Sequence, residues 1–273
     1  MNRAELLFAI LIGFVQGVLE WLPISSQGNV SIAVTLVSDI DPAVAVDLAL
    51  FVQLGTILSA ATYYRADIKT ALEHLPGWRP WTAYSEDNAE ITFIGLASAA
   101  TGVVGIPLYL TLRAAVSGLA SGLFIAVIGG LLISTGLLQR ASEAIDIDPK
   151  ETPTLSDTLL VGGLQGVTIL PGISRSGTTV SVLLLRGYSG TTSLRLSFLL
   201  SIPASLGAAL LVVLSGDGLP GISPAAAAVA LAVSAVVGFV TIDALMRFVE
   251  RVPFWQVCLG LGGLAVVGGL AVL

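Results

Sequence analysis

The segment LPGISRSGTT, residues 170–179, places an arginine among hydroxyl side chains between two long apolar runs. Arg175 carries a planar, permanently charged guanidinium whose fork of N–H donors suits a phosphate. Ser174, Ser176 and Thr179 supply further hydrogen-bond donors around it. This combination of residues predicts a binding site for a phosphate-like anion.

A second polar segment, QGVLEWLPISSQGN at residues 16–29, contains an amide and a carboxylate. Gln16 and Glu20 are four residues apart, so they would share one face of a helix that leads to Ser25 and Ser26. A carboxylate inside a membrane costs about 2.5–3.5 kcal/mol and indicates a functional site by default. Beside a bound anion it needs an arginine, a proton or a metal cation. A divalent cation, Mg²⁺ or Ca²⁺, that bridges Glu20, Gln16 and phosphate oxygens would fit this chemistry.

A structural role is the alternative for the same groups. Arg175 would then pair with Glu20 only to hold two segments together. Serines in membrane helices also commonly bond to the backbone or allow close packing. The residue types alone leave both interpretations open.

The two polar segments occupy equivalent positions in an internal repeat. Residues 16–18, QGV, recur at residues 165–167, an offset of 149. At the same offset Ser26 aligns with Arg175, so the duplicated frame carries different chemistry in its two copies.

Composition places the chain in a membrane. The mean hydropathy is +0.94 and only 11% of the residues are charged, against about 25% in an ordinary soluble domain. The net charge of −6 argues against a nucleic-acid partner. Segments of about 20 apolar residues can cross a bilayer. Six are found, at roughly 43–64, 90–112, 115–138, 193–215, 223–247 and 252–273.

Two further apolar stretches, 5–37 and 155–186, are each broken near the middle by a Pro/Ser/Gly cluster. Each half is short for a span and suits one arm of a re-entrant hairpin. Pro23 and Pro171 would end the first arms, and the serines that follow would cap the second arms. We therefore expect an all-α polytopic membrane protein, with six transmembrane helices plus two re-entrant helical hairpins in one membrane domain, residues 1–273.

Each repeat contains one hairpin and three spans, the first in residues 1–138 and the second in residues 155–273. A hairpin returns to its own side and three is an odd number, so the second repeat should be inverted relative to the first. Nine basic residues then fall on one side and two on the other, which places both termini outside by the positive-inside rule. The richer side holds Arg65, Lys69, Arg79, Arg140, Lys150, Arg186, Arg195, Arg247 and Arg251, and the poorer side holds Arg3 and Arg113.

Hairpins that enter from opposite sides can bring their tips together inside the protein. Two helix N-termini would then face one cavity, where their N–H groups and dipoles favour an anion. The sequence thus predicts a phosphate-binding cavity at membrane depth.

The two polar segments resemble the signatures of the undecaprenyl-diphosphate phosphatase family, the bacitracin-resistance proteins. QGVLEWLPISSQGN is similar to the first signature, (E/Q)xxxE followed by a Pro-x-Ser-Ser break, and LPGISRSGTT to the second, PGxSRSxxT. The motifs match in order and spacing, and the pattern of hairpins and spans extends the resemblance to nearly the whole chain.

The resemblance implies a cell-membrane enzyme that hydrolyses a polyprenyl diphosphate to the monophosphate and inorganic phosphate, recycling a lipid carrier at a site open to the outer face. By position, Gln16 and Glu20 fall on the metal-associated motif, Ser26 on a nucleophile or catalytic hydroxyl, and Arg175 on a diphosphate-binding arginine. The remaining expected substrate contacts are Ser25, Asn29, Ser174, Ser176 and Thr179.

This chain departs from the family pattern at two positions. Asn29 stands where the family commonly has a histidine, and the single histidine, His74, falls in a predicted cytoplasmic loop. A phosphohistidine mechanism therefore does not transfer. Gln16 occupies a position often held by Glu, which weakens any metal site built from two carboxylates.

An anion or lipid-phosphate transporter with the same inverted-repeat architecture is the main alternative, because architecture alone does not decide function. A lipid phosphatase that uses two active-site histidines is excluded by the single histidine. An inert binder of lipid diphosphates stays open. So do the prenyl chain length, the metal, serine or water as the nucleophile, and the oligomeric state, a homodimer included.

Overall fold

The computed structural model describes residues 2–37, 40–86, 88–143, 150–215, 221–249 and 252–273, so Arg251 lies outside the described residues. Its elements in these ranges are helical. The α-helices are α1 (Arg3–Leu19), α2 (Ser26–Val37), α3 (Pro42–Tyr63), α4 (Arg65–His74), α5 (Ala89–Val116), α6 (Ser121–Glu143), α7 (Leu155–Val167), α8 (Arg175–Leu185), α9 (Gly190–Ser215), α10 (Pro224–Val249) and α11 (Phe254–Ala271).

Six of these helices, α3, α5, α6, α9, α10 and α11, are long and apolar enough to cross a membrane. This confirms the predicted all-α polytopic class, and the chain is a multi-pass membrane protein. The boundary predicted between the second and third spans was wrong. Helix α5 continues to Val116 and α6 begins only at Ser121, because the turn between them lies at Gly118, whose φ of +72° ends the helical path.

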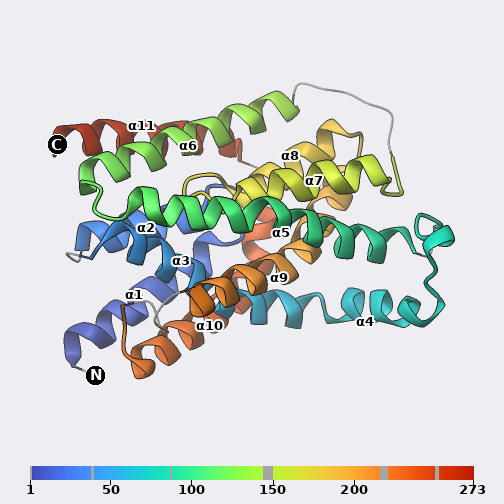
Figure 1. Cartoon of the computed structure of the whole chain (residues 1–273), viewed down its shortest axis with the longest axis horizontal. Helices are drawn as coiled ribbons and strands as arrows, with labels where there is room; N and C mark the ends of the chain where they lie inside the picture. Colours follow the sequence, from blue (N-terminus) through green and yellow to red (C-terminus); the bar gives the residue numbers. More distant parts are fainter. Residues whose placement is uncertain (1, 38–39, 87, 144–149, 216–220, 250–251) are drawn as a thin grey trace.

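The connection between α3 and α5, predicted as a loop, contains the polar helix α4. His74 is the last residue of this helix. The oppositely charged side chains of Lys69 and Glu73, one turn apart, stabilise this helix. Lys69 Nζ lies 3.7 Å from Glu73 Oε1. Helix α4 lies at the end of the molecule opposite both chain termini (Figure 1).

Two helix–break–helix units, α1–α2 and α7–α8, lie in the two stretches where broken helices were predicted. Their helices contain 11 to 17 residues. The longest therefore reaches about 26 Å, less than the roughly 30 Å thickness of a bilayer core. This is compatible with re-entrant hairpins, whose placement in the bilayer stays a prediction.

The first helix of each unit packs against a span from the other half of the chain, α1 on α10 and α7 on α5. Glycines at equivalent repeat positions allow the close approach. A methyl group at Gly13 would lie 2.5 Å from the carbonyl oxygen of Ala230, and one at Gly162 would lie 2.5 Å from that of Ala97. The two glycines thus make equivalent close contacts at an offset of 149, while the division into two repeats stays a prediction.

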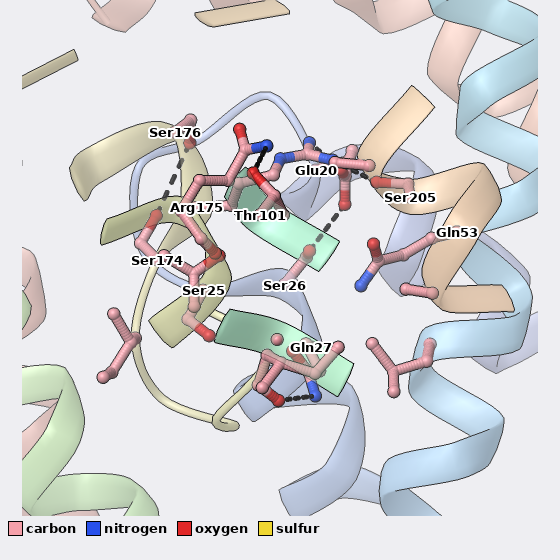
Figure 2. A pocket seen from close by; sticks show the side chains of 18 of the residues that line it. Glu20, Ser25, Ser26, Gln27, Gln53, Thr101, Ser174, Arg175, Ser176 and Ser205 are labelled. Atoms are coloured by element: carbon pink, nitrogen blue, oxygen red, sulfur yellow. Dashed lines mark hydrogen bonds and ion pairs between the residues drawn. The ribbon is translucent and has the colours of Figure 1, made fainter. Parts of the chain in front are cut away.

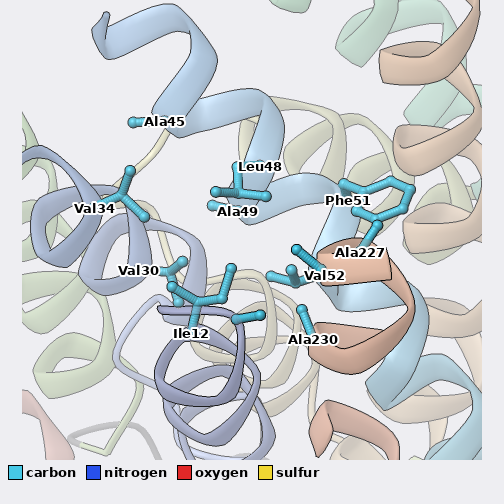
Figure 3. Close-up of a cluster of buried hydrophobic side chains, with 12 residues drawn as sticks. Ile12, Val30, Val34, Ala45, Leu48, Ala49, Phe51, Val52, Ala227 and Ala230 are labelled. Atoms are coloured by element: carbon cyan, nitrogen blue, oxygen red, sulfur yellow. The ribbon is translucent and has the colours of Figure 1, made fainter. Parts of the chain in front are cut away.

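Buried apolar clusters hold each unit in place. In Figure 3, Ile12 of α1 and Val30 of α2 meet Leu48 of α3 and Ala230 of α10. A second cluster joins α7 and α8 to α5 and α9 through residues such as Val161. Each hairpin is therefore fixed by spans from both repeats.

A buried ion network fixes the base of the second hairpin, at the start of α7. Asp157 accepts hydrogen bonds from Arg186 at 2.5 Å and Tyr188 at 2.7 Å, and it pairs with Lys150. Burial by itself would raise the pKa of the Asp157 carboxyl, but these donors together with Thr154 outweigh it and hold the pKa well below its ordinary value. The carboxylate therefore stays ionised and paired at neutral pH.

Two neighbouring glycines in α7 give a matched test of the close packing. Gly162→Ala should lower stability by about 1–3 kcal/mol, since overpacking at a helix contact must be relieved by movement. Gly163→Ala should be neutral or slightly stabilising, because no atom lies within 4 Å of an added methyl group there. Thermal unfolding in detergent micelles measures both, and equal midpoints would contradict the packing described.

Candidate active site

The breaks of the two hairpins touch each other through their backbones. A methyl group at Gly28 would lie 2.7 Å from the backbone nitrogen of Gly172. Ser25 Oγ accepts a hydrogen bond from that nitrogen at 3.1 Å, and Gln27 Nε2 donates to the carbonyl oxygen of Ile169 at 3.0 Å. The two polar segments, 149 residues apart in sequence, therefore form one structure.

Local backbone geometry aims two helix N-termini at this point. Ser25 has a φ of +59°, an uncommon left-handed conformation for a residue with a side chain, which turns the chain into α2. Ser174 caps α8, its Oγ accepting from the N–H of Gly177. Helix α6 supports both breaks, because Gln139 donates to the carbonyl of Pro23 and Thr135 to that of Gly172.

Glu20 is the centre of the site, and the residue is 6% exposed. One oxygen, Oε2, accepts hydrogen bonds from Gln16 Nε2 and from Ser26 Oγ, both at 2.6 Å. The other oxygen, Oε1, forms an ion pair with Arg175. Figure 2 shows Arg175 and Ser26 reaching Glu20 from different hairpins. The carboxylate is thus placed to receive the hydroxyl proton of Ser26.

Helix α9 holds the guanidinium of Arg175 on its other side. The NH1 group donates to Ser205 Oγ and, at 3.4 Å, to the carbonyl oxygen of Ser201. The Nε atom is buried without a hydrogen-bond partner. Because an arginine carries five N–H donors, the contacts to Glu20 and α9 leave donors for an anion.

A cavity opens beside these groups, and six of the predicted site residues line it. They are Glu20, Ser25, Ser26, Ser174, Arg175 and Ser176. The two hairpins therefore bring the carboxylate, the arginine and four hydroxyl groups to one volume, as the sequence predicted.

Three predicted residues lie outside the lining. Gln16 is buried beside Glu20, and its Nε2 donates to that carboxylate. Asn29 Nδ2 donates to the carbonyl oxygen of Ser25 at 2.9 Å and so braces the start of α2. Thr179, fully buried, donates to the carbonyl oxygen of Arg175 at 2.9 Å. These side chains support the residues that line the cavity.

Six polar residues of the lining were not among the predicted site residues: Gln27, Gln53, Thr101, Gln165, Thr168 and Ser205. Three of them lie on spans, where a single polar side chain is usually read as a packing residue. Gln165 could have been found, because it aligns with Gln16 at the repeat offset. Its Nε2 donates to Thr101 Oγ1 at 3.1 Å, and its Oε1 is buried without a partner, as is Oε1 of Gln16.

The capacity of the site for a metal rests on few groups. Within the described ranges no three His, Cys, Asp or Glu residues cluster as metal ligands. Glu20 offers one carboxylate, and Gln16 offers an amide oxygen that lacks a hydrogen-bond partner. Mg²⁺ is commonly held by one or two carboxylates together with substrate phosphates and water. The residues therefore fit a cation that phosphate oxygens help to bind.

Comparison with known proteins gives one consistent result. The family model described as bacitracin resistance protein BacA matches residues 9–264. The chain is similar to the undecaprenyl-diphosphatase of Haloarcula marismortui, with 54% identity over 98% of each chain. It is also similar to those of Methanococcoides burtonii, with 39% identity over 95% of this chain and 96% of the relative, and Methanopyrus kandleri, with 37% identity over 99% and 98%.

The ion pair between the two hairpins predicts a non-additive effect on stability. Glu20→Gln or Arg175→Met alone should destabilise the protein by about 3–5 kcal/mol, because each leaves one buried charge without its partner. The double variant should recover much of this loss, since no buried charge remains. Thermal unfolding in micelles measures the cycle.

The exposed pair Asp243–Arg247 on α10 supplies the control. Asp243→Asn should leave the unfolding midpoint nearly unchanged, because solvent screens a surface pair. Additive losses in the Glu20/Arg175 cycle would show that the pair does not couple the hairpins.

Proposed function

Because the chain belongs to the bacitracin resistance protein BacA family, we propose that it is an integral-membrane phosphatase that hydrolyses a polyprenyl diphosphate to the monophosphate and inorganic phosphate. The observation that carries the proposal is the pairing of Ser26 Oγ with Glu20, 2.6 Å apart, next to Arg175 from the other hairpin. This set contains a nucleophile or water-orienting hydroxyl, a base and a phosphate ligand.

The diphosphate head binds in the cavity between the hairpin breaks. Arg175 supplies a fixed charge and its remaining N–H donors. Ser25 and Ser174 cap the N–H groups of Gly28 and Gly177, and the other first-turn N–H groups of α2 and α8 contribute further donors. Gln53 and Gln165 line the same cavity and offer neutral amide contacts to the head.

Glu20 activates the attacking oxygen. As Ser26 Oγ bonds to the terminal phosphorus, its proton passes to Glu20 and the bond to the bridging oxygen breaks, releasing the lipid monophosphate. Water then hydrolyses the phosphoserine. In the second route, a water held by Ser26 and Glu20 attacks directly and releases inorganic phosphate in one step. In both routes Arg175 stabilises charge on the phosphoryl oxygens.

A divalent cation, Mg²⁺ or Ca²⁺, would accompany the bound diphosphate. Glu20 and the unpartnered Oε1 of Gln16 would hold it. When bound, it neutralises phosphate charge that Arg175 alone cannot balance. Without it, the Glu20 carboxylate would repel the negatively charged substrate.

The proposed orientation places both termini outside the cell and the cavity toward the outer face. The basic residues of α4 and its neighbourhood lie at the end of the molecule opposite the termini (Figure 1). Ala204 and Ala208 line the cavity and belong to the half of α9 nearer Ser215. In the proposed orientation this is the end of α9 that lies toward the outside. Labelling of cysteines introduced at Asn2 and at Arg79, from either side of the membrane, tests this orientation.

Loss of the reacting groups should stop phosphate release from a polyprenyl diphosphate in detergent micelles. Glu20→Ala and Arg175→Ala should lower kcat by at least about a hundredfold, since base and charge stabilisation are each worth that much. Ser26→Ala separates the two routes, because complete loss favours serine attack and partial activity favours water. Turnover by the wild type in micelles also separates an enzyme from a transporter, which needs sealed compartments.

Ser134→Ala is the matched control, because Ser134 is exposed on α6 away from the cavity. It should retain wild-type turnover. Normal turnover by either the Glu20 or the Arg175 variant would refute the mechanism.

Removal of divalent cations should abolish phosphate release, and added Mg²⁺ or Ca²⁺ should restore it. Gln16→Leu should raise the cation concentration needed for half-maximal activity, because it removes one of the two protein oxygens. A titration of activity against free cation measures both effects. Undiminished release in excess chelator would remove the cation from the proposal.

A further inference from the structure

A second cavity adjoins the active site between α5 and α9. Its lining includes Gly102 and Ile106 of α5, and Pro203, Gly207 and Leu211 of α9. Unlike the active-site cavity, it offers few polar groups, and they lie at one end. It is therefore suited to an apolar ligand.

The two cavities are continuous in their linings. Five residues line both: Thr101, Gly105, Ile169, Ala204 and Ala208. Ile169 is the repeat counterpart of Glu20, so an apolar side chain stands where the first hairpin has its carboxylate. We call the second cavity, together with the residues it shares with the active-site cavity, the seam between α5 and α9. The seam leads from the charged head site into apolar surroundings without a break.

The second cavity reaches the apolar outer surface of the protein. Side chains beside it on both helices are exposed and apolar: Val103 is 76% exposed and Leu110 51%, and Leu206 is 53% and Leu210 55%. In a membrane protein such side chains face lipid. The seam therefore opens sideways into the bilayer.

Two glycines keep the seam open without being required by helix packing. A methyl group at Gly207 would meet no atom within 4 Å, and one at Gly102 would meet only the end of Ile106, at 3.9 Å. This differs from Gly13 or Gly162, where an added methyl group would collide with backbone. The open space at Gly102 and Gly207 is available to a ligand.

We infer that the seam between α5 and α9 binds the first part of the prenyl chain while the diphosphate head occupies the active site. This inference rests on the proposed function, since it gives that substrate's tail a defined path. The lining from residue 98 to residue 106 covers about 12 Å along α5, so the rest of a long chain extends into lipid. Apolar contact along the seam adds binding energy that the head alone does not supply.

Leucine at either open glycine tests the seam. Gly102→Leu and Gly207→Leu should lower kcat/KM for farnesyl and undecaprenyl diphosphate at least about tenfold, the equivalent of about two buried methylene groups. Gly268→Leu on α11, another open position, should keep the wild-type value. Wild-type kcat/KM in both seam variants would overturn the inference.

A farnesyl diphosphate analogue with a photoreactive group at the end of its chain gives a second readout on the wild-type protein. It should label peptides of α5 and α9 that contain residues 102–106 and 207–211. Labelling confined to other helices would overturn the seam, even if the leucine variants fail to fold. Absence of phosphate release by the wild type, with α5 and α9 labelled, would instead refute the proposed function and leave the seam standing.

Discussion

The site depends on one ion pair between two hairpins, Glu20 with Arg175. Burying both charges costs several kcal/mol per ion, and the pair is tolerated because hydrogen bonds satisfy the remaining lone pairs and N–H groups. Gln16 and Ser26 do this for the carboxylate, and Ser205 does it for the guanidinium. A diphosphate that arrives at this pair adds negative charge beside a neutralised arginine. A diphosphate bound here would therefore need the proposed cation and the two helix N-termini to balance its charge.

The fold serves this pair by fixing the two breaks to each other and to the spans. The backbones of Gly28 and Gly172 lie so close that neither break could take a side chain at this contact. Helix α6 holds both breaks, through Gln139 and Thr135. Helix α1 packs on α10 and helix α7 packs on α5, so each hairpin depends on a span from the other half of the chain. The reacting groups are consequently held by rigid elements, although they stand on irregular backbone.

Hydropathy and the repeat offset predicted most of the fold, because span length and broken helices leave direct marks on composition. They could not locate the turn at Gly118, since the apolar pattern continues through it. Site residues near the breaks were predicted from their polar or charged side chains. The residues of the spans that line the cavity were not predicted. Gln53 and Ser205 have no local signal, because only packing between distant spans brings them to the site. Asn29 was predicted as a substrate contact by position, yet nearby carbonyl groups occupy its amide.

The packing of α1 against a span from the other half of the chain has a consequence for biosynthesis. Helix α1 is made well before its packing partner α10, which begins only at Pro224. At roughly 5–20 residues per second, the ribosome needs about 10–40 s to produce the roughly 200 residues that separate them. During that interval the glycine-lined face of α1 has no native neighbour. This face of α1 must therefore lie in provisional surroundings, such as lipid or the insertion machinery, until α10 has been made.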